Sequence, residues 1–222
     1  MIKIQKRDKK ILTLIYEHSF LLRAHIRRLF PNDAETRRRI IELKNNHYIR
    51  EVPSPIACSG QVIRLTQHGI RFVEEYYPTR IEQIRHLSPT KHQHDSHVIH
   101  VRLRLEELWN GNWIAENLLP RAREEIPDGI FVFPSGKRIF IELENSLKSR
   151  KRFLDRLYVF KEKILVLYIA SSPTLERSLK RYLKSAESLP PLALIKLSSL
   201  LDSTPAVWSP NNNLSLFHTK EF

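Results

Sequence analysis

Three acidic side chains gather in the stretch 126–145, which reads IPDGIFVFPSGKRIFIELEN. The turn-forming sequence PSGK separates two short apolar runs, a pattern that predicts a β-hairpin. Asp128 stands where the first strand begins, and Glu142 and Glu144 lie near the end of the second. Because side chains two residues apart on a strand share a face, Glu142 and Glu144 point the same way, and hairpin pairing can bring Asp128 alongside them.

Carboxylates held together on a mostly apolar sheet repel one another, and a divalent cation relieves the repulsion. Hard oxygen ligands suit Mg²⁺ or Mn²⁺. The nearest basic residues in the sequence, Lys137, Arg138 and Lys148, lie at the predicted turn or beyond the strand end. We therefore predict a metal site at the three acids. The alternative is an acidic strand end that faces solvent.

The charge of the chain indicates a polyanionic partner. The 222 residues carry a formal net charge of +13, and residues 1–90 alone hold 17 basic and 9 acidic side chains. An excess that is densest in one part of a chain is typical of a nucleic-acid-binding region. No basic amphipathic helix with a Trp/Phe face is evident, so double-stranded DNA is favoured over a membrane surface.

The single cysteine, Cys58, excludes an internal disulfide and a thiolate zinc cage, and it fits a reducing cytosol. The sequence shows no apolar run long enough to cross a bilayer and no signal-peptide pattern at its start. We expect a cytoplasmic protein.

The N-terminal part, residues 1–78, has the pattern of a winged helix-turn-helix. Apolar periodicity predicts a first helix capped by Asp8, a second at 22–30 and a third at 34–45 capped by Asp33. Strands at 48–52 and 62–65 enclose a turn-rich tip, and Thr66 begins a closing helix. In this architecture the third helix enters the DNA major groove and the hairpin wing follows the backbone.

The third helix carries three consecutive arginines, Arg37, Arg38 and Arg39. Successive residues on a helix are about 100° apart, so the three cannot all face a groove. The predicted DNA contacts are Arg37, Arg38 and Lys44 on the third helix, with Arg50 and Arg64 on the wing contacting phosphates. The alternative is a solvated basic helix in a winged domain that binds protein.

Residues 79–95 have the mixed polarity of a linker. Four histidines lie in or just beyond it: His92, His94, His97 and His100. They could suggest zinc, but the first two are expected in a loop and no cysteine accompanies them. His97 and His100 are expected to share a face of a helix 96–109 that Asp95 caps, so phosphate contacts or packing are favoured over a metal site.

Residues 96–202 follow the order αβββαβαβ, which predicts a mixed sheet flanked by helices and an α/β (α+β) fold class. The basic helix 148–163 follows the hairpin, and the apolar run 164–170 is typical of a central strand covered on both faces. A helix capped by Thr174 and a strand at 192–197 complete the domain. The tail 203–222 is rich in Ser, Thr, Pro and Asn and is expected to be weakly ordered.

This C-terminal part resembles the PD-(D/E)xK nuclease superfamily. Pro127-Asp128 matches the first element of its motif, and Glu142-Leu143-Glu144 matches the second except that Glu144 stands where the lysine belongs. The superfamily's frequent acid on the leading helix corresponds to Glu106 or Glu107. The resemblance implies a metal-dependent site composed of Asp128, Glu142, Glu144 and Lys148.

The carboxylate at Glu144 removes a cation and adds an anion where such nucleases activate water. Metal-bound hydroxide could still attack, with Lys148 or Lys151 reaching in from the next helix. The alternative is a degenerate nuclease fold that now only binds. Because the cluster keeps three acids but lacks the lysine, the degenerate fold that binds without cutting is favoured over an active nuclease.

Over residues 7–165 the chain also resembles the bacterial replication-relaxation family of plasmids and other mobile elements. The matching features, in order, are Arg7-Asp8 with Ile11-Leu12, the Arg-rich third helix, Leu65-Thr66-x-x-Gly69, His97, Trp113 with Glu116, Pro127-Asp128-Gly129, Glu142-Leu143-Glu144 and Tyr158. This resemblance implies a DNA-binding protein acting in replication, mobilisation or transcription control, as a homodimer or with partner proteins of the element. The alternatives are an active endonuclease targeted by the winged helix and a protein-binding assembly factor.

Overall fold

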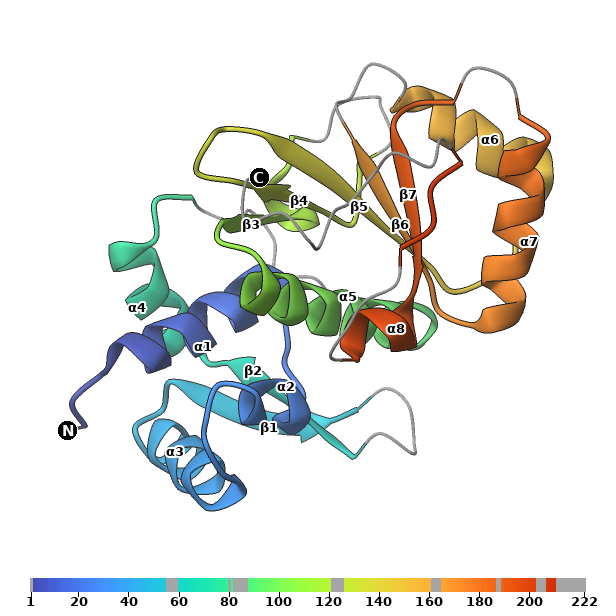
Figure 1. Ribbon diagram of the computed structural model, residues 1–222. Coiled ribbons are helices and arrows are strands. Elements are labelled where there is room, and N and C mark those ends of the chain that lie inside the picture. The colour runs from blue at the N-terminus through green and yellow to red at the C-terminus, as the bar shows by residue number, and fades with distance from the viewer. Residues whose placement is uncertain are drawn as a thin grey trace. The chain divides into compact units, whose positions relative to one another are not determined.

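A computed structural model of the chain describes residues 2–54, 60–79, 81, 88–120, 126–160, 165–186, 189–202 and 207–210 (Figure 1). The chain forms two compact units, an N-terminal unit, Met1–Ile99, and a C-terminal unit, His100–Phe222. Cys58, the end of the predicted basic helix and most of the predicted tail lie outside the described residues. The mixed α/β fold class predicted from the sequence is confirmed.

The N-terminal unit contains helices and a two-stranded antiparallel hairpin. Its antiparallel strands pair directly, with Ile49 opposite Leu65 and Arg50 opposite Arg64. The elements are α1 (Lys6–His18), α2 (Arg23–Arg27), α3 (Asp33–Asn45), β1 (Ile49–Pro53), β2 (Gln61–Leu65) and α4 (Gln67–Tyr76). Strand β2 is also bridged to Leu21, which precedes α2. The predicted succession of three helices, a hairpin and a closing helix is therefore present.

The predicted caps of two helices are displaced. Helix α1 begins after Gln5, and Asp8 sits inside its first turn, where its carboxylate accepts the backbone N–H of Gln5 at 2.7 Å. Helix α3 begins after Asn32, whose side chain accepts the N–H of Glu35 at 2.9 Å. Acidic residues are favoured both at the cap and in the first turn, because both positions lie near the positive end of the helix dipole. The sequence alone therefore does not distinguish the two positions.

Helix α5 spans Pro89–Leu108 and starts well before the predicted Ser96. His92 and His94 are therefore helical, and the expectation of a loop there was wrong. Proline suits the first turn of a helix, and the carbonyl of Ser88 accepts the N–H groups of Lys91 and His92 at 3.1 and 2.9 Å. The two compact units divide within α5, between Ile99 and His100.

The C-terminal unit is built on a five-stranded sheet in the order β3-β4-β5-β6-β7. Strands β3, β4 and β5 pair antiparallel, and β5, β6 and β7 pair parallel. After the C-terminal half of α5 come β3 (Asn112–Ala115), the 3₁₀ turn η2 (Glu116–Leu118), β4 (Gly129–Val132), β5 (Arg138–Glu144), α6 (Arg150–Val159), β6 (Val166–Ala170), α7 (Pro173–Lys184), β7 (Leu192–Lys196) and α8 (Leu197–Leu201). The predicted order αβββαβαβ is thus present, and α8 is an addition. Helix α7 is capped by Ser172 rather than by the predicted Thr174.

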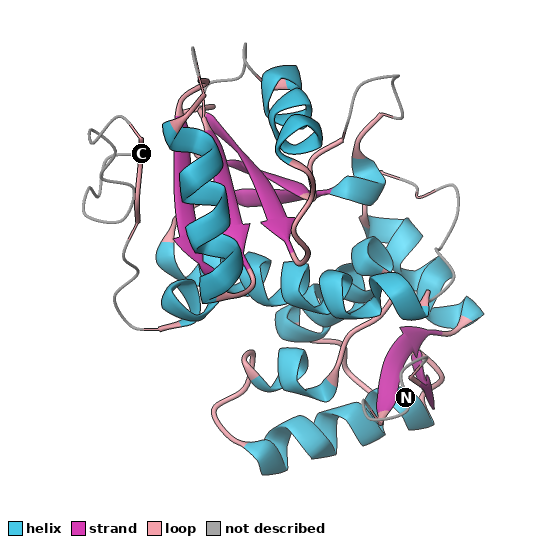
Figure 2. Cartoon of the chain, turned by 90° about the vertical axis from the view of Figure 1, so that its right-hand side faces the viewer, coloured by secondary structure: helices cyan, strands magenta, loops and turns pink. Residues whose placement is uncertain are grey.

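Helices α6 and α7 pack on one face of this sheet (Figure 2). Phe153 and Leu157 of α6 and Leu179 of α7 join Tyr168 of β6 in one buried apolar cluster. Every residue of β6 is buried, which confirms the prediction of a central strand. On β5, Phe140 stacks on Phe160, which follows α6 and belongs to this cluster. Glu142 and Glu144 share a strand face with Phe140, so they point to the same side of the sheet.

The outer strand β7 is bridged by a segment that follows α8. Leu194 and Trp208 exchange two backbone hydrogen bonds of 2.7 and 2.9 Å, and the Ser209 hydroxyl donates to the Leu192 carbonyl at 2.9 Å. Residues 207–210, which we expected in a weakly ordered tail, therefore pair with the sheet. In the part of the chain that the structure describes, no helix combines the length and apolarity needed to cross a membrane.

Candidate functional site

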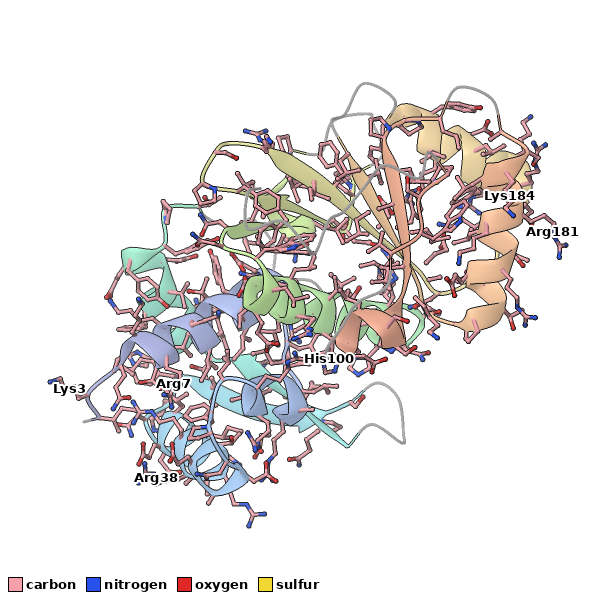
Figure 3. All side chains as sticks on the ribbon, in the orientation of Figure 1. Lys3, Arg7, Arg38, His100, Arg181 and Lys184 are labelled. Carbon is pink, nitrogen blue, oxygen red and sulfur yellow. The ribbon has the colours of Figure 1, made fainter. Side chains whose placement is uncertain are left out.

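Helix α3 separates its residues cleanly between core and solvent. Thr36, Ile40 and Leu43 are buried. Arg37 and Arg38 are exposed, as are Ala34, Ile41, Lys44 and Asn45. Arg38 projects outward from α3 (Figure 3). The residues predicted to face DNA on this helix thus lie on its free face, with apolar side chains among them.

Arg39 lies on the opposite side and joins α3 to α1. Its guanidinium Nε donates to Asp8 at 2.7 Å, a second nitrogen contacts the same carboxylate, and a third contacts Glu42 at 2.5 Å. Asp8 is 1% exposed and the Arg39 side chain 13%. The hydrogen bond from Arg39 to Asp8 raises the pKa of Arg39, with burial opposing it. Of the three consecutive arginines, this one is committed to the interior.

A shallow hollow of about 530 Å³ follows the free face of α3. It is lined by Asp33, Ala34, Arg37, Arg38, Ile41 and Glu42. Arg38 is 3.9 Å from Glu42, and Lys44 contacts Glu51 at 2.5 Å. Exposed ion pairs of this kind are weak, so they leave these cations able to exchange partners.

Two arginines face each other on the hairpin. Arg50 of β1 is the direct cross-strand partner of Arg64 of β2, so both side chains emerge on the same face. The Nε of Arg64 donates to the Ser19 carbonyl at 3.2 Å, which fixes the base of this side chain. Burial, followed by the charge of Arg50, lowers the pKa of Arg64. Like charges directly opposite each other destabilise a hairpin, and an anion between them would offset the repulsion.

The acids of the C-terminal unit come together as the hairpin predicts. Gly129 pairs with Ile141, and one further step in this register sets Asp128 across from Glu142. A carboxylate oxygen of Asp128 accepts the backbone N–H of Leu143 at 2.7 Å. The strands β4 and β5 therefore hold Asp128 and Glu142 at the same end of the sheet.

Each glutamate on β5 has a basic partner. Glu142 is buried and contacts Arg156 of α6, with its two oxygens at 2.8 and 3.0 Å from Nη2. Glu144 is also buried, and Lys148 contacts it at 2.9 Å. Burial raises the pKa of Glu142 well above its ordinary value, the charge of Asp128 adds to that rise, and Arg156 opposes it.

These contacts bear on the predicted Mg²⁺ or Mn²⁺ site. Within the described residues, no group of three or more His, Cys, Asp or Glu side chains is arranged to hold a metal ion. Lys148, which the resemblance places at the site, contacts Glu144, and α6 brings Arg156 to Glu142. The Mg²⁺ or Mn²⁺ site at Asp128, Glu142 and Glu144 stays a prediction. Arg156 is the residue that sequence reasoning missed.

The other predicted polar residues have structural partners. Glu106 contacts Arg102 at 2.8 Å and Glu107 contacts Arg104 at 3.3 Å, both within α5. His92 is buried, and its ring stacks on that of Phe20 with 4.8 Å between the ring centres. Burial lowers the pKa of His92. Packing, one of the two favoured alternatives for the histidines, thus describes His92.

Two glycine motifs position the elements around these sites. A Cβ on Gly129 would lie 2.0 Å from the Trp113 indole, so only glycine lets β4 approach this ring. A Cβ on Gly69 would lie 2.0 Å from the Tyr48 carbonyl oxygen, while the Thr66 hydroxyl accepts the Gly69 N–H at 3.1 Å and caps α4. Both motifs support the hairpins on which the candidate residues lie.

Comparison with known proteins identifies the family. No curated protein and no solved structure matches the chain. The model of the replication-relaxation family matches residues 12–163, more than half of the sequence and parts of both compact units. The chain therefore belongs to the replication-relaxation family.

Proposed function

We propose that this chain is a sequence-directed DNA-binding protein that acts in the replication, mobilisation or transcription control of a plasmid or mobile element. Membership of the replication-relaxation family associates it with replication of such elements. The observation that carries the proposal is the free face of α3, where Arg37 and Arg38 are exposed while Arg39 is held in the interior.

The geometry of the N-terminal unit supports this function. In a winged helix-turn-helix the third helix enters the major groove and the hairpin lies along the backbone. Helix α3 is the third helix, and its face offers two guanidinium groups that can pair with the N7 and O6 acceptors of guanine. Arg50 and Arg64 on the hairpin are placed to contact phosphate, which would also neutralise their mutual repulsion.

The net charge of +13 supports the same partner. Neutralising phosphates releases bound counterions, so affinity for duplex DNA falls steeply with salt. A winged domain that holds a protein partner would not bind duplex DNA with an affinity that falls steeply with salt. Titration of a labelled duplex at increasing salt therefore separates DNA binding from the assembly-factor alternative.

We expect the double substitution Arg37→Ala/Arg38→Ala to weaken binding to a preferred duplex by about 1–3 kcal/mol for each base that an arginine side chain reads. If either residue contacts phosphate instead, the slope of log affinity against log salt falls by about 0.9 per phosphate. The matched control is Arg181→Ala/Lys184→Ala, which removes the same charge from exposed positions on α7 (Figure 3). Unchanged affinity and slope in the α3 variant would refute the proposed role of this helix.

We further propose that the C-terminal unit does not cut DNA and has only a binding role. Glu142 and Glu144 are each paired with a cation, and Asp128 accepts a backbone N–H. Glu144 replaces the lysine that the nuclease motif uses to assist the attacking water. The unit then contributes a nuclease-like scaffold, with its acids held in ion pairs.

We expect the chain to leave supercoiled plasmid intact in the presence of Mg²⁺ or Mn²⁺. Relaxation to the nicked form would be followed on agarose gels, with Asp128→Asn prepared in parallel. Metal-dependent nicking by the parent that disappears in Asp128→Asn would establish the endonuclease alternative. Nicking that is equal in both proteins would indicate a contaminating nuclease and leave the binding role as proposed.

A further inference from the structure

The free face of α3 contains an apolar strip that the fold itself does not use. Ile41 is 49% exposed, and in the described part of the N-terminal unit it is the one large hydrophobic side chain that is clearly exposed. Ile40 and Leu43 already supply the core contacts of this helix, with 6% and 0% exposure. Ala34 lies two turns earlier on the same face and lines the same hollow.

Charged side chains flank this strip, and Asp33 and Glu42 line the same hollow as the two arginines. Arg37 lies one turn before Ile41 on the same stripe of the helix, and Arg38 lies beside it. A β-branched residue has lower helix propensity than alanine or the long polar residues, so an exposed helical position does not itself favour isoleucine. A purely apolar protein partner would have to bury the two guanidinium groups next to Ile41 without compensation.

We propose that Ile41, supported by Ala34, recognises thymine in the major groove through its C5-methyl group. This proposal rests on the DNA-binding function proposed above. The methyl group of thymine is the apolar feature of the major groove, and guanine presents the acceptors that suit arginine. The face of α3 therefore fits a short segment in which a thymine lies one or two steps from a guanine.

The test begins with duplexes selected from a random pool by the full-length chain. In the selected site each thymine is replaced in turn by deoxyuridine, which removes the methyl group and keeps the base-pairing edge. We expect one or two positions at which this replacement weakens binding about fourfold, the equivalent of ~0.8 kcal/mol for one buried methyl group. All other positions should tolerate uracil.

The Ile41 variants assign that effect to one side chain. Ile41→Ala should bind the thymine duplex about as weakly as the parent binds the uracil duplex, with no further weakening when uracil is introduced. Ile41→Val, which keeps a branched apolar side chain, should retain most of the sensitivity. Because Ile41 is half exposed, equal melting temperatures of parent and variants are expected and confirm that folding is intact.

Two results would overturn the proposal. One is a selected site in which no thymine responds to loss of its methyl group. The other is an Ile41→Ala protein that keeps the full thymine preference. Both results leave the proposed DNA-binding function in place. If the chain selects no duplex at all, the DNA-binding function itself is contradicted.

Discussion

Replacing Arg39 by alanine is expected to lower the free energy of unfolding by about 3–5 kcal/mol, because it leaves the carboxylate of Asp8 buried without its counter-charge. Asp8 is 1% exposed, and Arg39 directs two of its nitrogens at this carboxylate. The same substitution also removes the ion pair between Arg39 and Glu42. Urea denaturation followed by circular dichroism measures the change.

The neighbouring residue provides the matched control. Arg38→Ala removes the same side chain from the same helix, but at a position where the side chain is 73% exposed. Its cost is expected to stay within about 0.5 kcal/mol. Equal destabilisation by the two substitutions would show that the contact with Asp8 does not hold α3 to α1. A double-mutant cycle with Asp8→Ala isolates the pair itself.

Arg156→Ala is expected to destabilise the chain by about 3 kcal/mol at pH 8, because the Glu142 carboxyl group then stays buried without the cation that offsets its charge. The cost should shrink as the pH falls. The folded-state pKa of Glu142 is raised, so the folded state holds a proton more tightly than the unfolded state, and this contribution to stability is lost as pH rises through the raised pKa. Removal of Arg156 raises that pKa further and steepens the pH dependence.

Unfolding in urea at pH 8 and pH 5 provides the measurement. Arg152→Ala, at an exposed position on the same helix, is the control and should cost little at either pH. Adding Glu142→Gln to Arg156→Ala should recover most of the stability, since no buried charge remains. Destabilisation that is the same at both pH values and is not rescued would assign Arg156 to packing rather than to charge.

The sequence predicted the elements that have strong periodicity. The apolar run at 139–143 and the turn before it predicted the hairpin, and with it the position of Asp128 opposite Glu142. The spacing on α3 indicated that its three arginines could not share a face, and Arg39 proves to be the one that turns inward. Periods of two and 3.6 residues determine such faces locally, without knowledge of the tertiary packing.

What remained hidden depends on contacts between elements distant in sequence. Arg156 reaches Glu142 because α6 lies over the sheet, and no spacing in the sequence reports that crossing. The early start of α5 was missed because polar residues fill its buried side: His92 stacks on Phe20, and Ser96 hydrogen-bonds His25. A helix that buries histidine and serine lacks the apolar stripe by which helices are recognised.

The short segment around Trp208 has a consequence for self-association. An outermost strand with unpaired backbone groups is a template on which another chain can add, and the strand Leu192–Lys196 is almost entirely apolar. The hydrogen bonds that Leu194 exchanges with Trp208 occupy this edge from within the same molecule. Lys180 lies 5.6 Å from the centre of the Trp208 ring and adds a charge beside it. The segment thus covers part of the β7 edge and opposes the addition of a strand from another chain there.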